Sequence, residues 1–363
     1  MTSSVSTNVG SCSQTKYWRA ADPLIKEFYR GRKVLVIGAD GFLGTNCLEA
    51  LKALQSEISI VTRRLQPRVV DFSGTLFRGD IRDPELVQAA VEGQDIVVDF
   101  LGAAGAVDSN RDPNSNLEDE LRVHLSIFHA CALSRPSPVV LFCSSRLVFG
   151  APKYLPIDEN HPLAPASIYA VHKITAEKYL EVFAKTRGLR SCVLRLSNPY
   201  GPNQVEGPRG YGIINQFLRN AARGKAIRLY GDGRQKRDYV HVEDVLGAFL
   251  TCAMNRKCHG QIFNFGGRTT MSLRDAVELI AQLSGGVHVT FEPWPSDYEA
   301  VETGDYATDF HKIDSFIDLP PQRTIEEGFL EVLNSYRDEK SAPAFKTSVE
   351  PLGSSVLTEG LSR

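Results

Sequence analysis

The sequence predicts an α/β protein built on a doubly wound parallel sheet, followed by a smaller α/β lobe. Up to residue 197, short runs of β-branched residues alternate with amphipathic segments, a pattern typical of parallel strands covered by helices. A glycine-spaced turn follows the first run, and after Asn198 turn-rich pieces such as NPYGPNQ and YGDGRQ separate shorter elements. We therefore expect the lobe to pack at the carboxyl ends of the strands, with a substrate cleft between lobe and sheet.

The expected elements follow from this alternation in chain order. Each strand is a short apolar or β-branched run, and each helix spaces its apolar residues for one buried face. The strands are expected at 33–38, 58–62, 75–79, 96–101, 139–144 and 191–196. The helices are expected at 42–54, 84–91, 117–133 and 167–186, and then at 212–222, 243–253 and 273–283. Residues 1–15 and 341–363 are rich in small and polar residues without periodicity, and we expect them to be disordered.

The bulk composition argues against several classes of function. With 363 residues, 41 Lys plus Arg and 43 Asp plus Glu, the chain can bury a large core but has no net field to attract nucleic acid or a membrane. Its seven cysteines and eight histidines are scattered without the spacing of a metal site, which suits a reducing compartment. The polar N-terminus has no apolar segment of signal-peptide or membrane-spanning length. We expect a soluble cytoplasmic protein that holds no metal.

The glycine-spaced turn is GADGFLG, with Gly38, Gly41 and Gly44, between an expected strand and an expected helix. Glycines there let the backbone turn tightly and approach a pyrophosphate, which the helix N-terminus at Phe42 and Leu43 then attracts. The spacing differs from G-x-G-x-x-G, and such turns also occur for packing. In its context the turn predicts a dinucleotide-binding, Rossmann-type domain over residues 16–197. Residues 198–340 are then mainly the substrate lobe.

The end of the second expected strand bears on the choice of dinucleotide. An NAD site usually has an acidic residue there, whereas ISIVTRRLQP places Arg63 and Arg64 in that region. Two guanidiniums would attract a 2′-phosphate, so NADP(H) is favoured and NAD is the alternative. Alternatively, the two arginines could belong to an ordinary solvated basic turn that binds no phosphate. Asp80 and Ile81 follow the third strand, where the carboxylate could meet the adenine amino group or cap the next helix.

An acid–base group is indicated by Tyr169 and Lys173, which stand four residues apart and share one helical face. A phenol has a pKa of about 10. The ammonium and the positive charge of a nicotinamide would both lower that pKa toward neutrality. Tyr169 could then exchange a proton with an alcohol or carbonyl oxygen while hydride is transferred at the carbon. Ser145, at the end of a strand, would polarise the carbonyl or simply cap a turn.

Taken together, GADGFLG, SSRLVFG, YAVHK, LRLSNPYGP and YGDGRQKRDYVHVEDV resemble the extended short-chain dehydrogenase/reductase family acting on nucleotide-activated sugars. The resemblance spans roughly residues 33–333. It implies a catalytic trio of Ser145, Tyr169 and Lys173. It also implies that Asn198 and Arg237 bind the diphosphate of a nucleotide sugar, that Tyr230 packs on its base, and that the protein is a homodimer formed through the helices at 117–133 and 167–186. Without the resemblance, Arg237 could form a surface ion pair and Tyr230 could be a core aromatic.

Four residues depart from the pattern of this family. Arg146 and Leu147 replace the acids that 4,6-dehydratases and decarboxylases carry after the catalytic hydroxyl, so both reactions are disfavoured. His124 occupies a place where family members commonly have Asn, and it could keep that role or fill the core. Glu302 stands where some epimerases have a second phosphate-binding arginine, and its carboxylate would repel a diphosphate.

The function that the sequence favours is that of an NADPH-dependent ketoreductase. It would reduce C4 of a nucleotide-activated, dTDP-linked 4-keto-6-deoxy sugar, as in deoxysugar biosynthesis. An NAD(P)-dependent 4-epimerase is the alternative, because the same trio can oxidise C4 and return the hydride to the other face. A non-catalytic dinucleotide-binding protein would be expected to discard Tyr169 and Lys173.

Overall fold

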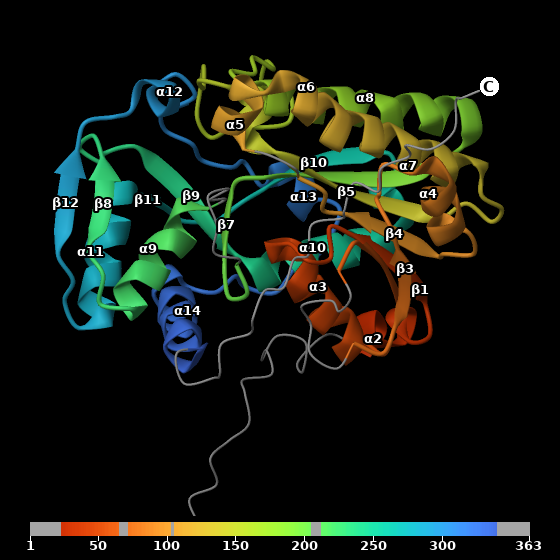
Figure 1. Cartoon of the computed structure of the whole chain (residues 1–363), viewed down its shortest axis with the longest axis horizontal. Helices are drawn as coiled ribbons and strands as arrows, with labels where there is room; N and C mark the ends of the chain where they lie inside the picture. The colour runs from red at the N-terminus through yellow and green to blue at the C-terminus, as the bar shows by residue number, and fades with distance from the viewer. Residues whose placement is uncertain (1–22, 65–71, 103–104, 205–211, 340–363) are drawn as a thin grey trace, which may run out of the picture.

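A seven-stranded sheet, with every strand parallel, forms the centre of the protein in a computed structural model that describes residues 23–64, 72–102, 105–204 and 212–339 (Figure 1). The strand order is β10-β6-β5-β4-β1-β2-β3. The bounds are β1 Lys33–Ile37, β2 Glu57–Thr62, β3 Thr75–Arg78, β4 Ile96–Asp99, β5 Val139–Ser145, β6 Arg190–Leu196 and β10 Gln261–Phe265. The expected doubly wound parallel sheet is confirmed.

Helices cover both faces of this sheet, because the central strands are buried on both sides and each helix has one apolar face. One face packs against α2 (Pro23–Tyr29), α3 (Phe42–Ala53), α10 (Val242–Met254) and α13 (His311–Asp314). The other packs against α4 (Pro84–Val91), α7 (Arg122–Leu133) and α8 (Ile168–Arg187). Short segments join them: α5 (Ala106–Arg111), α6 (Pro113–Asn116), the π-helical turn η1 (Leu117–Leu121) and the 3₁₀ turns η2 (Arg146–Phe149) and η3 (Arg256–Cys258).

A smaller lobe has a core of its own and lies beside the carboxyl ends of the strands (Figure 1). Its sheets are β7-β9-β11, with bounds Asn198–Tyr200, Lys236–His241 and Thr270–Ser272, and the parallel pair β8 (Ile227–Tyr230) and β12 (Val289–Glu292). Its helices are α9 (Ile213–Ala222), α11 (Leu273–Ser284), α12 (Ser296–Glu299) and α14 (Ile325–Glu339). Between β9 and β11 the chain leaves the lobe, forms α10 and β10, and completes the large sheet beside β6.

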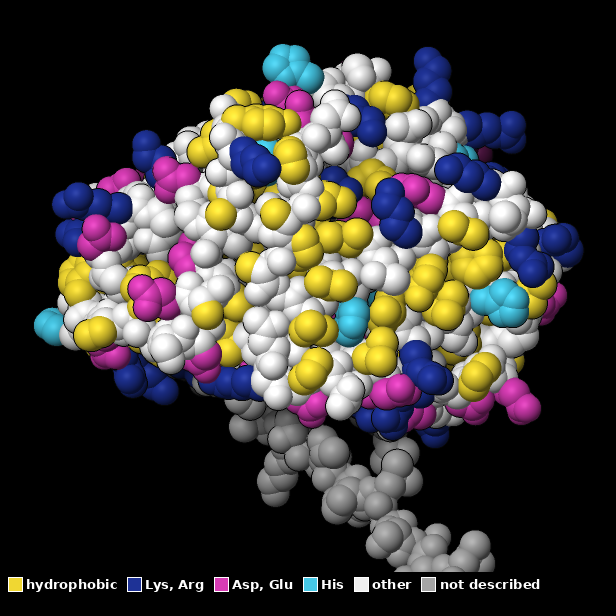
Figure 2. Space-filling view, turned by 90° about the horizontal axis from the view of Figure 1, so that it is seen from above, with side chains coloured by type: hydrophobic (Ala, Val, Ile, Leu, Met, Phe, Trp, Pro, Cys, Tyr) yellow, Lys and Arg dark blue, Asp and Glu magenta, His cyan; other side chains and the backbone are white. Residues whose placement is uncertain are grey.

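The surface formed by α5 to α8 carries several exposed hydrophobic side chains. Figure 2 looks on to this face and shows hydrophobic side chains across its middle. On α7 and α8 they are Leu125, Leu133, Val171 and Val182. None of the described helices combines the length and the apolar character that a membrane span needs.

The six expected strands and seven expected helices are present, with ends that shift by a few residues. Several further elements were not expected, and two differences concern the large sheet and the helices on it. The helix expected at 117–133 begins with a π-helical turn, and residues 261–265 form a seventh strand of the large sheet. The segments expected to be disordered, 1–15 and 341–363, lie outside the described residues.

Candidate active site

Ser145, Tyr169 and Lys173 come together where β5 ends and α8 begins. Ser145 is the last residue of β5, and its hydroxyl accepts a hydrogen bond from the backbone N–H of Leu147, which starts η2. Ser167 caps α8 by accepting from the N–H of Ala170. The cap places Tyr169 in the first turn and Lys173 one turn later on the same face. Ser145 therefore caps a turn, as one interpretation had it, while it also lies within reach of the phenol.

Tyr169 is a buried phenol with two favourable partners. Hydrogen bonding by the Ser145 side chain favours its ionised form, and the Lys173 ammonium lies 5.4 Å from the centre of its ring. Burial raises the pKa of Tyr169 to about 12, although Lys173 and the bond to Ser145 both act to lower it. The pKa near neutrality expected from the sequence is therefore not reached in the chain alone. The effect of Lys173 has the expected sign, but desolvation outweighs it.

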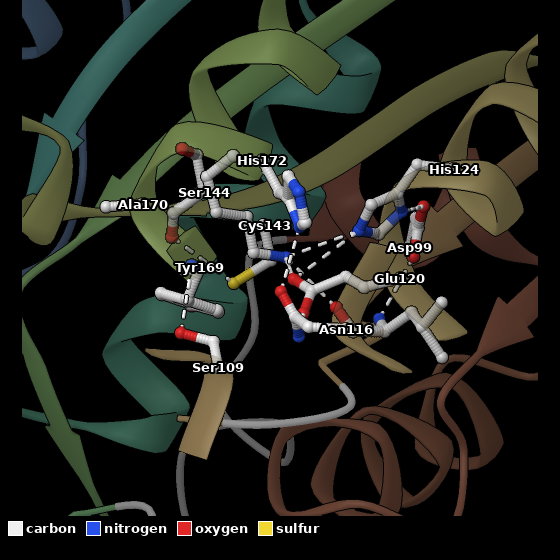
Figure 3. A network of polar contacts seen from close by, with 12 residues as sticks. Asp99, Ser109, Asn116, Glu120, His124, Cys143, Ser144, Tyr169, Ala170 and His172 are labelled. Atoms are coloured by element: carbon white, nitrogen blue, oxygen red, sulfur yellow. Dashed lines mark hydrogen bonds and ion pairs between the residues drawn. The ribbon is translucent and has the colours of Figure 1, made fainter. Parts of the chain in front are cut away.

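Lys173 is held by Glu120, His124 and the carbonyl group of Leu101, and Figure 3 shows Glu120 and His124 to the right of Tyr169. Its ammonium is 3.0 Å from a carboxylate oxygen of Glu120 and 3.0 Å from the carbonyl oxygen of Leu101, to which it donates. Nε2 of His124 lies 3.4 Å from the same ammonium. Burial lowers the pKa of Lys173, but the neighbouring negative charges, Glu120 foremost, raise it by more, so Lys173 stays an ammonium.

Sequence reasoning missed Asp99 and Glu120 and left His124 undecided. All three are fully buried, and Nδ1 of His124 lies 2.7 Å from the carboxylate of Asp99. One signal was available: Asp99 ends the apolar run IVVD, where an acidic residue needs a buried partner. Glu120 gave no such signal, because LEDEL contains three acidic residues and helical spacing alone does not show which of them turns inward.

The turn between β1 and α3 has the shape that a dinucleotide requires. Gly38 has a positive φ of 74°, and a Cβ on Gly44 would overlap the carbonyl oxygen of Gly38, so the turn leaves no room for side chains. Gly41 is the N-cap of α3 and supplies no side-chain cap, which leaves the first N–H groups of the helix for an anion. Phe42 and Leu43 pack against the core beneath the turn. The residues present thus fit a pyrophosphate.

A carboxylate that sequence reasoning overlooked lies against the end of β2. Asp40, from the glycine turn, accepts a hydrogen bond of 2.7 Å from the hydroxyl of Thr62 and lies 3.5 Å from Nε of Arg64. Of the two arginines expected to bind a 2′-phosphate, Arg64 is therefore paired with an acid. Arg63 is exposed and has no ion pair with any described residue.

Asp80 does not cap the helix that follows it, so this interpretation was wrong. The cap of α4 is Asp83, which accepts from the N–H of Glu85. Asp80 instead binds the guanidinium of Arg82 at 2.6 and 3.1 Å, and Ile81 packs against the core. The charge of Arg82 holds the pKa of Asp80 below its usual value. A contact of this carboxylate with adenine stays a prediction.

On the lobe side, the expected diphosphate ligands already have protein partners. Arg237 forms an ion pair with Glu302, and Nδ2 of Asn198 donates to Asp238 at 3.4 Å. Glu302 thus neutralises the arginine beside it. The alternative that Arg237 pairs at the surface is also wrong, because its side chain is buried and its partner is Glu302.

Tyr230 ends β8 within a small aromatic group. Its ring centre lies 5.8 Å from that of Trp294 and 6.0 Å from that of Tyr298. Neither Trp294 nor Tyr298 was singled out from the sequence. Both lie on the segment after β12, which the parallel pairing of β12 with β8 brings alongside Tyr230.

Comparison with known proteins agrees with this geometry. A profile of the NAD-dependent epimerase/dehydratase family matches residues 34–266, which is more than half of the chain. The chain belongs to this family. Residues 34–266 contain the glycine turn, the end of β5 and the start of α8, so the epimerase/dehydratase match includes Ser145, Tyr169 and Lys173.

Relatives within the epimerase/dehydratase family differ in reaction. The chain is 28% identical over 307 residues to a putative UDP-glucose 4-epimerase of Methanocaldococcus jannaschii, covering 83% of this chain and 97% of that protein. It is 27% identical over 321 residues to a dTDP-glucose 4,6-dehydratase of Streptomyces antibioticus, covering 85% and 93%. The structure of a Thermus thermophilus UDP-glucose 4-epimerase in complex with NAD is similar, with a TM-score of 0.74, 26% identity and coverage of 84% and 99%.

Arg146 follows Ser145 directly, and its surroundings limit what it can do. Its guanidinium donates to the Thr303 hydroxyl at 2.9 Å and lies over the ring of Tyr306. Burial lowers the pKa of Arg146 to about 10, and the charge of Arg237 acts in the same direction. At neutral pH the group remains protonated and cannot accept a proton. Leu147, next along η2, has no proton to exchange.

Proposed function

We propose that this enzyme of the epimerase/dehydratase family acts at C4 of a nucleotide sugar, and that it works as a 4-epimerase that retains NAD. One observation carries the choice: the carboxylate of Asp40 at the end of β2. A carboxylate there accepts hydrogen bonds from ribose hydroxyls and repels a 2′-phosphate. A retained NAD serves a reaction that oxidises and then reduces the same carbon. The names of several relatives point in the same direction.

In the proposed reaction each member of the trio has a separate task. When bound, the nicotinamide supplies a site that takes up hydride and gives it back. Tyr169 removes the proton of the C4 hydroxyl as hydride leaves the carbon, and it returns the proton when hydride is restored from the other face. Ser145 donates a hydrogen bond to the C4 oxygen, and Lys173 supplies a fixed positive charge. Arg146 and Leu147 offer no base for the loss of water or of carbon dioxide.

The rest of the substrate would lie along the lobe. We propose that Asn198 and Arg237 bind the diphosphate and that Tyr230, with Trp294 and Tyr298, packs on the base. Because Arg237 is already paired with Glu302, a diphosphate would have to share this guanidinium or displace the carboxylate. In this proposal residues 16–197 hold the dinucleotide and residues 198–340 mainly hold the sugar nucleotide.

A second candidate, an NADPH-dependent ketoreductase acting on a dTDP-linked 4-keto-6-deoxy sugar, is favoured by Arg63. This exposed guanidinium has no ion pair with a described residue and could meet a 2′-phosphate despite Asp40. Both candidates use Ser145, Tyr169 and Lys173 in the same way. They differ in whether the dinucleotide stays bound.

The decisive experiment is to extract and identify the dinucleotide that copurifies with the full-length protein, and then to supply UDP- and dTDP-hexoses. The 4-epimerase proposal expects about one bound NAD per chain and interconversion at C4 without net oxidation of added NADPH. Protein that purifies without dinucleotide and consumes NADPH when given a 4-keto sugar nucleotide would be a ketoreductase. Binding of dinucleotide without either reaction would mean a non-catalytic protein.

We also propose a cytoplasmic homodimer joined through α7 and α8. The exposed Leu125, Leu133, Val171 and Val182 on these helices suit a second copy of the same face. The described cysteines are all free thiols, which fits a reducing compartment.

A further inference from the structure

Beside Tyr169 lies a row of four buried titratable groups, Lys173, Glu120, His124 and Asp99, of which Figure 3 labels the last three. Lys173 meets Glu120 at 3.0 Å, Glu120 lies 3.8 Å from Nε2 of His124, and Nδ1 of His124 meets Asp99 at 2.7 Å. Asp99, Glu120 and His124 are inaccessible to solvent, and Lys173 is 2% exposed. Taking charges out of water costs several kcal/mol per ion, so a row of this kind needs close pairing to persist.

Glu120 belongs to the π-helical turn η1 and is the buried acidic residue of that turn. Of the three acidic residues on this turn, Glu118 binds Arg122 and Asp119 binds Arg82, both at the surface. Glu120 faces inward, and its second oxygen accepts from Nδ2 of Asn116 at 3.1 Å. Widened turns of this kind are frequent at functional sites.

The contact between Glu120 and Lys173 also affects the phenol of Tyr169. Lys173 lies between Tyr169 on one side and Glu120 on the other. In a site with little water, a carboxylate 3.0 Å from an ammonium cancels much of the field that the ammonium exerts on a third group. Glu120 therefore weakens the help that Lys173 gives to a phenolate.

We propose that Glu120 is a positioning residue that acts through Lys173 to keep Tyr169 protonated in the free enzyme. This inference rests on the proposed acid–base role of Tyr169 and adds the group that controls it. A second positive charge beside the phenol is then needed before Tyr169 gives up its proton, so premature loss of the proton is suppressed.

The other charged groups near the phenol do not replace Glu120. Besides Lys173 and Glu120, the groups that act on Tyr169 are Cys143 and the Ser145 hydroxyl. Asp99 is occupied by His124 and by the N–H of Leu101. His172 is bound to Asn116 and is not among the groups that act on Tyr169. The effects on the pKa of Tyr169 agree with this proposal, because burial raises that pKa, Lys173 lowers it, and Glu120 raises it.

The test compares how readily Tyr169 loses its proton in wild-type protein and in Glu120→Gln. Tyrosine labelled with ¹³C at Cζ reports ionisation by NMR, and the Tyr169 signal is assigned with Tyr169→Phe. All samples are the purified full-length protein, depleted of dinucleotide to the same measured content, because the proposal concerns the free enzyme. We expect Tyr169 in Glu120→Gln to ionise at a pH lower by about one unit or more, which is about tenfold in proton affinity. The alkaline side of the pH–rate profile should move in the same direction.

Glu118→Gln is the matched control, because it removes the same charge two residues away at the surface, and Tyr169 should then ionise as in wild type. Identical ionisation of Tyr169 in wild type and Glu120→Gln over the whole pH range in which both are folded would overturn the proposal, as would a shift to higher pH. If Glu120→Gln does not fold, Glu120→Gln with His124→Asn leaves neutral amide side chains at both positions, and the same shift is expected there.

The proposed role and a purely structural role give different results. If Glu120 merely held the fold together, its loss would lower the melting temperature and leave the ionisation of Tyr169 unchanged. If the protein turned out to lack C4 chemistry altogether, the NMR shift would still be expected, so failure of the proposed function and failure of this inference are distinguishable.

Discussion

The carboxylate of Asp40 accepts a hydrogen bond from the Thr62 hydroxyl at 2.7 Å, joining the glycine turn to the end of β2. The two residues are 22 positions apart in the chain, and the parallel sheet brings them together where a dinucleotide fold holds the adenosine ribose. This contact supplies an acid at the carboxyl end of the second strand, where the strand itself has none.

Asp40→Asn is expected to weaken the binding of NAD about tenfold and to tighten that of NADP, because a hydrogen bond to a charged group contributes about 1.5–3 kcal/mol. Isothermal titration of nucleotide-depleted protein with each dinucleotide measures both effects. Asp318→Asn, an exposed acid elsewhere, serves as the control. Should Asp40→Asn leave both affinities unchanged while Arg63→Ala with Arg64→Ala weakens NADP alone, the arginines would be the residues that discriminate.

Tyr169→Phe should lower kcat at least about a hundredfold, because the proton on the C4 oxygen then has no acceptor or donor. Binding of NAD and of UDP should be unchanged, since the ring and the helix cap remain. Tyr154→Phe removes an exposed hydroxyl that binds Asp158 and should have no effect. Near-normal turnover by Tyr169→Phe would show that another group carries the proton.

Glu302→Gln should tighten the binding of UDP or dTDP several-fold, because it frees the charge of Arg237 for the diphosphate. Equilibrium titration with each nucleotide, in wild type and in Glu302→Gln, measures the change. Glu299→Gln, an exposed residue nearby, is the control. Weaker binding would mean instead that Glu302 is needed to hold Arg237 in place.

Asp238 should make the protein lose stability as pH rises between about 4 and 6. Burial raises the pKa of Asp238 to about 6, against the hydrogen bonds from Thr308 that lower it. A carboxyl with a higher pKa in the folded state binds its proton more tightly there. Its favourable contribution is complete below the unfolded pKa of about 3.9 and is lost above 6, a difference on the order of 3 kcal/mol.

Urea unfolding of wild type and Asp238→Asn at several pH values tests this expectation. The slope of unfolding free energy against pH in this window should become less negative in Asp238→Asn. Asp232→Asn, at an exposed turn, should keep the wild-type slope. Parallel curves for Asp238→Asn and wild type would show that Asp238 does not titrate there.

Val182→Glu should convert the proposed dimer to a monomer, since a carboxylate would be buried in an apolar interface. Val182 is 55% exposed in the single chain, so the fold itself should tolerate the change. Light scattering coupled to size exclusion gives the mass of each form. A monomeric wild-type protein would refute the proposed interface directly.

Much of the fold could be predicted because its signals are local. Apolar strands such as KVLVI and the capped helix that begins after Ser167 can be recognised from a few consecutive residues. β10 could not be recognised in this way, since its place depends on pairing with β6, far away in the chain. Glu120 and Asp40 were missed for a related reason. Both are ordinary acids until the fold gives them Lys173 and Thr62 as partners, whereas Asp99 could have been noticed at the end of the apolar run IVVD.

The return of the chain from the lobe to β10 also decides what a truncated protein can do. A fragment stopped after β6 would lack the neighbour that β6 has in the complete sheet, and its unpaired backbone groups would invite association with other chains. The later half, expressed separately, would carry β10 with nothing to pair with. Neither half should give a folded, non-aggregating protein when it is produced alone. If the gene is split at the boundary between sheet and lobe, both pieces should have to be co-expressed.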